Sequence, residues 1–159
     1  MPIDQLPQSL RDKYEIHEWK HACAILKSDF PNEYRDIVEI LDEFELRRSS
    51  IVRPGGAKSP ISNFFDSRFF ARGWEEKSFE TKIVVDEVPS ETPTHKIDCF
   101  RNKVGLEIEW NNKDPFFDRD LNNFRLLFDL RALSVGIIIT RCDDLQQIFK
   151  SLNKGPSYG

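Results

Sequence analysis

The sequence predicts an α/β fold of the mixed α+β kind, because the spacing of its apolar residues changes along the chain. A helical period runs through residues 8–72, where charged side chains separate the apolar ones. From Lys82 to Trp110 the period is two, with β-branched and alternating runs. The expected order is helix, helix, short helix, three strands, helix, strand, helix.

Three helices are expected in the N-terminal half. Residues 8–28 have helical spacing and stop at Asp29 and Pro31, so they predict a first helix. A second begins at residue 31 or 32 and runs to about Arg48. A short helix over residues 61–71 carries phenylalanines that we expect in the core, namely Phe64, Phe65, Phe69 and Phe70.

The strands follow from residues 83–85, 96–100 and 104–110. The tight polar turn Arg101-Asn-Lys103 joins the last two segments, so they form an antiparallel hairpin. Residues 119–133 then return to the helical period. Residues 135–140 are a continuous apolar run typical of a strand buried on both faces, and a last helix reaches Leu152.

The chain has 159 residues, which fits one domain with a helical part at about 8–72 and a sheet core at about 80–152. Its three cysteines are far apart and form no CxxC pair, and no signal peptide or membrane-spanning run is evident, so a cytoplasmic protein is expected. The uncapped end Gly155-Pro-Ser-Tyr-Gly159 leaves open a truncation at the C-terminus.

The formal net charge of −4 argues against a protein that coats nucleic acid by charge alone. Basic residues are nevertheless concentrated in one segment, and residues 53–60 are rich in Pro and Gly. This stretch is interpreted either as an ordinary basic loop or as an arm that contacts DNA. The basic residues of the segment are Arg47, Arg48, Arg53, Lys58, Arg68 and Arg72.

Three acidic residues lie on the expected hairpin. Side chains alternate faces along a strand, so Glu107 and Glu109 share one face. The short turn brings Asp98 alongside the start of the strand that bears Glu107. The three carboxylates are therefore expected to converge at one end of the sheet.

Three close negative charges need compensation, and a hard divalent cation provides it best. We expect Mg²⁺ to be bound by Asp98, Glu107 and the Ile108 carbonyl, and Glu109 to orient or deprotonate an attacking water. The alternative is an exposed strand face whose acids meet water and basic side chains. The pattern D-x8-E-x-E is short, so spacing alone leaves both interpretations open.

Four segments together resemble the catalytic core of type II restriction endonucleases of the PD-(D/E)xK superfamily, in the BglII/BamHI-like branch. They are Ile97-Asp98, Val104-Gly-Leu-Glu-Ile-Glu-Trp110, Asn111-Asn-Lys-Asp-Pro-Phe-Phe117 and Val135-Gly-Ile-Ile-Ile-Thr140. The resemblance is clearest over residues 94–142. Two positions depart from the superfamily name: Ile97 stands where it has Pro, and Glu109 replaces its lysine, as in that branch.

The resemblance implies a restriction-endonuclease-like core, in which a central mixed β-sheet is flanked by helices. It further implies a homodimer that cleaves double-stranded DNA at a short palindrome with Mg²⁺, and a cognate DNA methyltransferase as functional partner. A fourth acidic or amide residue should precede the hairpin. Glu76 is the candidate, with Glu75 and Glu80 as alternatives, although all three also suit an ordinary solvated position.

Polar residues that follow the acidic strand are candidates for DNA binding. Asn111 and Arg119 suit base edges, and Lys113 suits phosphate. Asp114, Asp120 and Asn123 lie in the same stretch. The alternative is a polar loop followed by a helical turn, and neither interpretation gives a recognition sequence or a cleavage position.

Two other functions remain open. One is a repair or junction nuclease of the same superfamily, which would prefer branched or damaged DNA. The other is a non-catalytic DNA-binding or interaction domain that keeps the fold. The presence of Asp98, Glu107 and Glu109 together favours a Mg²⁺-dependent endodeoxyribonuclease.

Overall fold

The computed structural model describes residues 2–52, 59–93, 95–110 and 117–153. Two expectations of the sequence lie largely outside these ranges. They are the basic loop, of which residues 53–58 are not described, and the chain end at residues 155–159.

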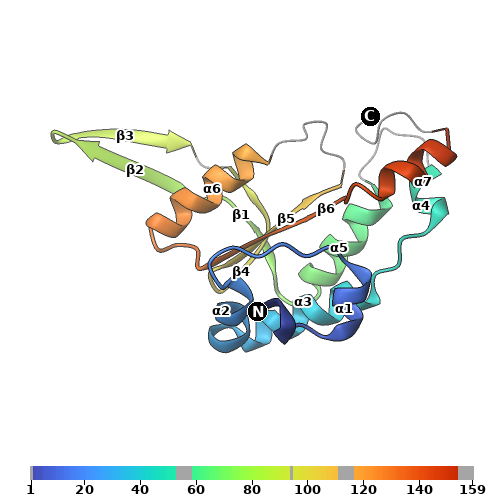
Figure 1. The fold of residues 1–159 in the computed structure, drawn as a ribbon. Coiled ribbons are helices and arrows are strands. Elements are labelled where there is room, and N and C mark those ends of the chain that lie inside the picture. Colours follow the sequence, from blue (N-terminus) through green and yellow to red (C-terminus); the bar gives the residue numbers. More distant parts are fainter. Residues whose placement is uncertain (1, 53–58, 94, 111–116, 154–159) are drawn as a thin grey trace.

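A four-stranded mixed sheet forms the centre of the fold (Figure 1). Its strand order is β1 (Glu75–Lys77), β4 (Ile97–Arg101), β5 (Val104–Glu109) and β6 (Val135–Thr140). The pairs β1–β4 and β4–β5 are antiparallel, and β5–β6 is parallel. The sequence-based prediction of a mixed α/β fold with an antiparallel hairpin at Asp98 and Glu107 is confirmed.

The helices that precede the sheet are shorter and more numerous than the sequence predicted. The expected first helix is two, α1 (Gln8–Lys13) and α2 (Ala22–Asp29), because Lys20 and His21 adopt left-handed φ angles of 52° and 59° that a right-handed helix cannot include. The expected second helix ends at Glu43, earlier than the predicted Arg48, and a separate helix begins at Arg48. The remaining helices at this end of the chain are η1 (Pro2–Gln5), α3 (Pro31–Glu43), α4 (Arg48–Val52) and α5 (Pro60–Phe70).

Helices α3 and α5 cover one face of the sheet (Figure 1). Phe65 and Phe69 of α5 are buried there beside Cys99 and Leu106 of the sheet, as the sequence predicted. Phe70 is 45% exposed, so its predicted place in the core is wrong. It lies one residue beyond the buried Phe69, on the part of the helix that faces away from the sheet.

Helix α6 (Asp118–Asp129) covers the opposite face of the sheet (Figure 1). Phe124 and Leu127 pack against Ile97 and Leu133. A Cβ atom added at Gly136 of β6 would lie 2.5 Å from the ring of Phe124, so glycine is what permits this close approach. The helix is therefore seated directly on the sheet, and the last helix, α7 (Leu145–Ser151), follows β6.

Strand β6 has the predicted bounds but not the predicted burial. Among the described strands it lies at the end of the order, next to β5. Three of its residues, 137–139, are half-buried, and only Val135 is fully buried. Its apolar run therefore belongs to an outer strand, which explains why burial on both faces was a wrong prediction.

Strands β2 (Glu80–Val85) and β3 (Val88–Pro93) form a separate two-stranded hairpin that extends away from the rest of the fold (Figure 1). The sequence predicted part of β2 but neither β3 nor β1. Asp86 and Glu87 both have positive φ angles, as a two-residue hairpin turn requires. None of the helices in the described ranges is long and apolar enough to cross a bilayer.

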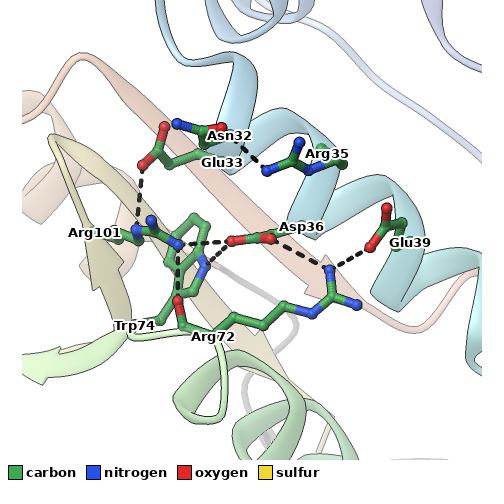
Figure 2. Close-up of polar contacts among 8 residues, drawn as sticks. All are labelled: Asn32, Glu33, Arg35, Asp36, Glu39, Arg72, Trp74 and Arg101. Carbon is green, nitrogen blue, oxygen red and sulfur yellow. Dashed lines mark hydrogen bonds and ion pairs between the residues drawn. The ribbon is translucent and has the colours of Figure 1, made fainter.

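A network of buried and half-buried charges ties α3 to the sheet (Figure 2). The carboxylate of Asp36 accepts hydrogen bonds from Arg101 (2.9 Å), from Trp74 Nε1 (3.1 Å) and from Arg72 (3.3 Å). The same Arg101 forms an ion pair with Glu33 at 3.4 Å. Since Arg101 ends β4, this network fixes the strand that carries Asp98 from the side opposite α6.

We expect Asp36→Asn to lower the free energy of unfolding by on the order of 3 kcal/mol, because it leaves two arginines facing an uncharged buried group. Glu39→Gln is the matched control. Glu39 also pairs with Arg72 but is about half exposed, so its loss should cost less than about 1 kcal/mol. Urea denaturation of the three proteins measures both effects, and equal losses in the two variants would contradict the prediction.

Candidate active site

Asp98 and Glu107 face each other across the β4–β5 hairpin. The amide of Ile108 donates to Asp98 Oδ2 at 3.0 Å, and the amide of Asp98 donates to Glu107 Oε2 at 3.4 Å. Each carboxylate is thus held by the backbone of the opposite strand. The structure brings together the first two acids of the predicted site.

The carboxylate of Glu107 is buried and incompletely satisfied. The residue is 3% exposed, and its Oε1 atom has no hydrogen-bond partner in the described part of the chain. Burial, followed by the negative charges of Asp98 and Asp120, raises the pKa of Glu107 to about 8. An ionised Glu107 therefore needs a positive charge beside it.

Glu109 lies two residues further along the same face of β5. Its side chain is 13% exposed, and Oε1 pairs with Arg119 Nη2 at 3.2 Å. Burial and a hydrogen bond with Asp120 raise the pKa of Glu109 to about 7, against the opposing effect of Arg119. The third predicted acid therefore joins the same electrostatic cluster.

Asp120 is a fourth acid at this site, contributed by α6. It is 1% exposed, and its Oδ1 accepts a hydrogen bond from Arg119 Nε at 3.1 Å. From the sequence it was considered only as one of several DNA-facing residues. The missed signal is its spacing: Asp120, Phe124 and Leu127 are i, i+4 and i+7, which places the carboxylate on the buried stripe of the helix.

The candidates for an acid before the hairpin are placed elsewhere. Glu76 in β1 is exposed and pairs with Lys96 Nζ at 2.7 Å. Glu75 pairs with Lys77 at 3.6 Å, and Glu80 is exposed at the start of β2. The charges that raise the pKa of Glu107 are those of Asp98, Asp120 and Glu109, and Glu76 is not among them.

The candidates for DNA binding differ in their location and contacts. Asn111, Lys113 and Asp114 lie outside the described residues. Arg119 is 60% exposed but bonded to Glu109 and Asp120. Asn123 is buried and bonds both backbone groups of His95, at 2.9 Å and 3.2 Å, so it fixes the segment that leads into β4.

Three arginines of the basic segment pair with acidic side chains of the same protein. Arg47 pairs with Glu45, and Arg68 pairs with Glu43. Arg72 belongs to the network around Asp36. The charges of these three arginines are therefore partly balanced within the protein.

The donor set at the hairpin suits a hard cation. Carboxylate oxygens of Asp98 and Glu107 together with the Ile108 carbonyl are ligands that Mg²⁺ prefers. The unsatisfied Glu107 Oε1 fits the same interpretation. Over the ranges that the structure describes, however, His, Cys, Asp and Glu side chains do not form a ready-made group of three that could hold a metal ion.

The mixed sheet flanked by helices, with paired acids on its central hairpin, has the architecture of a restriction-endonuclease-like nuclease core. Residues 14–158 match the family model described as "Restriction endonuclease BglII/BglIII". The chain therefore belongs to the BglII/BglIII restriction endonuclease family, whose class is site-specific DNA-cleaving hydrolases. No significant match was found among curated proteins or among solved structures.

The raised pKa of Glu107 predicts how stability depends on pH in metal-free protein. Between its ordinary pKa of 4.5 and its folded value of about 8, the folded state binds a proton that the unfolded state has released. The contribution of Glu107 to the free energy of unfolding is therefore fully present below pH 4.5 and is lost as pH rises toward 8. Glu109 acts in the same direction up to about pH 7.

We expect Glu107→Gln to be more stable than wild type at pH 8, by more than about 1 kcal/mol, and to gain little at pH 5. The measurement is thermal unfolding across this range in EDTA. Glu76→Gln is the control, because Glu76 is exposed in an ion pair. If the unfolding temperature changes with pH in the same way in wild type and in Glu107→Gln, Glu107 does not carry the pH dependence of stability.

Proposed function

We propose that this protein is a type II restriction endonuclease that hydrolyses double-stranded DNA at a short palindrome with Mg²⁺. The observation that carries the proposal is the buried Glu107, which faces Asp98 with one carboxylate oxygen unsatisfied. A bound divalent cation would supply the missing positive charge. Membership of the family accounts for DNA as the substrate.

In this mechanism Asp98, Glu107 and the Ile108 carbonyl would hold Mg²⁺. When bound, the ion would supply Lewis acidity toward a phosphate oxygen and would lower the pKa of a water molecule. Glu109 orients the attacking water and accepts its proton as the water oxygen bonds to phosphorus and a P–O ester bond breaks, and the leaving oxygen takes a proton from solvent water. The backbone bonds of the hairpin keep the acids in place before DNA arrives.

The proposal predicts cleavage of a mixed DNA substrate into discrete fragments with Mg²⁺ and none with EDTA. Because the metal contributes several kcal/mol to the transition state, Asp98→Asn and Glu107→Gln should each lower the rate by at least about 100-fold. Sequencing of the fragment ends identifies the site. Asp129→Asn is the control, since Asp129 is exposed at the far end of α6.

Other outcomes would favour the alternatives. Faster cleavage of branched or damaged DNA than of linear duplex indicates a repair or junction nuclease. DNA binding without cleavage under any metal condition indicates a non-catalytic domain. Cleavage that survives both Asp98→Asn and Glu107→Gln would overturn the assigned site, and a DNA methyltransferase that blocks cleavage would support a restriction system.

We also propose that the protein acts as a homodimer in which each subunit cuts one strand. Helix α6 supports this, because Leu121 and Phe128 stand seven residues apart on one outward face and are each 54% exposed. Leu130, which follows the helix, is 50% exposed. A second copy of the same helix would bury this apolar face about a twofold axis.

We expect the double variant Leu121→Asp/Phe128→Asp to be monomeric, because two charges would have to be buried in the interface. Analytical ultracentrifugation measures the mass, and plasmid nicking in place of double-strand breaks is the functional result. Ile148→Asp in α7 is the control for an exposed apolar residue elsewhere. A wild-type protein that sediments as a monomer with and without DNA would refute the dimer.

A further inference from the structure

Asp120 occupies a position that apolar side chains normally fill. It shares the buried stripe of α6 with Phe124 and Leu127 and is more deeply buried than Phe124. Burial of a carboxylate costs several kcal/mol unless charged or hydrogen-bonding groups compensate it. Its partners should therefore explain its presence.

Those partners connect Asp120 to the acidic hairpin. Arg119 donates from Nε to Asp120 Oδ1 at 3.1 Å and from Nη2 to Glu109 Oε1 at 3.2 Å. One guanidinium thus bridges a carboxylate of α6 and a carboxylate of β5. Besides burial, the charge of Asp120 also contributes to the raised pKa of Glu109.

The bridge is useful only if α6 is itself fixed, and two contacts fix it. Gly136 lets the ring of Phe124 lie directly on β6. Asn123 bonds the backbone of His95 ahead of β4. The position of Asp120 is therefore set relative to β6 and to the start of β4.

We propose that Asp120 is a positioning residue for Glu109. It holds the Arg119 guanidinium, a planar group on a long flexible side chain, in the one orientation that also restrains the Glu109 carboxylate. This inference rests on the proposed function, in which Glu109 orients the attacking water. In this inference Arg119 binds the carboxylates of Asp120 and Glu109 and does not contact a base of the DNA.

The first test needs neither metal nor DNA. In ¹⁵N-labelled metal-free protein, the Nε–H group of Arg119 should give a separate signal that exchanges slowly, because it is bonded to a buried acceptor. Asp120→Ala should abolish this signal, whereas Asp120→Asn should keep it, since its amide oxygen still accepts the bond. Asp118→Ala is the matched control, because Asp118 is exposed at the start of the same helix.

The second test separates positioning from DNA binding. Loss of orientation should lower kcat by about 10–100-fold in Asp120→Ala and leave the KM for DNA within about threefold. Arg119→Ala removes the same bridge and should show the same loss of kcat at a temperature where both variants are folded, and the two changes together should add little. Asp120→Asn should recover part of kcat.

The outcomes distinguish this inference from the proposed function. If wild type cleaves DNA and Asp120→Ala cleaves as fast, only the role of Asp120 is overturned. If Arg119→Ala raises KM and leaves kcat unchanged, Arg119 contacts DNA and the bridge is not a positioning device. If wild type cleaves no DNA, the proposed function fails, whatever the Arg119 signal shows.

Discussion

The register between β4 and β5 is the constraint on which the site depends. The two-residue turn at Asn102 and Lys103, both with positive φ, sets which residues of the strands are opposite each other. In this register the amides of Asp98 and Ile108 bond the carboxylates of the opposite strand. A slip by one residue would turn Glu107 toward the apolar layer of α3 and α5 and away from the Asp98 amide that bonds it.

Contacts on both faces of the sheet hold this hairpin in place. On one face the charges around Asp36 fix the end of β4, away from the acids. On the other face α6 supplies Asp120 and Asn123 close to them. On the α6 face, Asp98, Glu107, Glu109 and Asp120 lie together, and burial and their mutual repulsion raise the pKa values of Glu107 and Glu109, an effect that a cation would relieve.

The sequence predicted the elements whose periodicity is strong and local. The hairpin at Asp98 and Glu107, the strand at 135–140 and the helix after residue 117 follow from spacing and turn residues. The break at Lys20 and His21 was not predicted, because the apolar spacing of residues 8–28 suits one helix and histidine adopts left-handed backbone in only a minority of cases. The burial of Asp120 follows from its spacing to Phe124 and Leu127, but the acids that it meets depend on how α6 packs on the sheet, which is a tertiary contact.

The contact between Gly136 and Phe124 has a consequence for how this protein can vary. Any side chain at position 136 would meet the ring and lift the helix from the strand. The two positions can therefore change only together, with a smaller residue at 124 accompanying a larger one at 136. Natural variation should thus be coupled between a strand and a helix that share no catalytic group, because their separation decides whether four acidic side chains can meet.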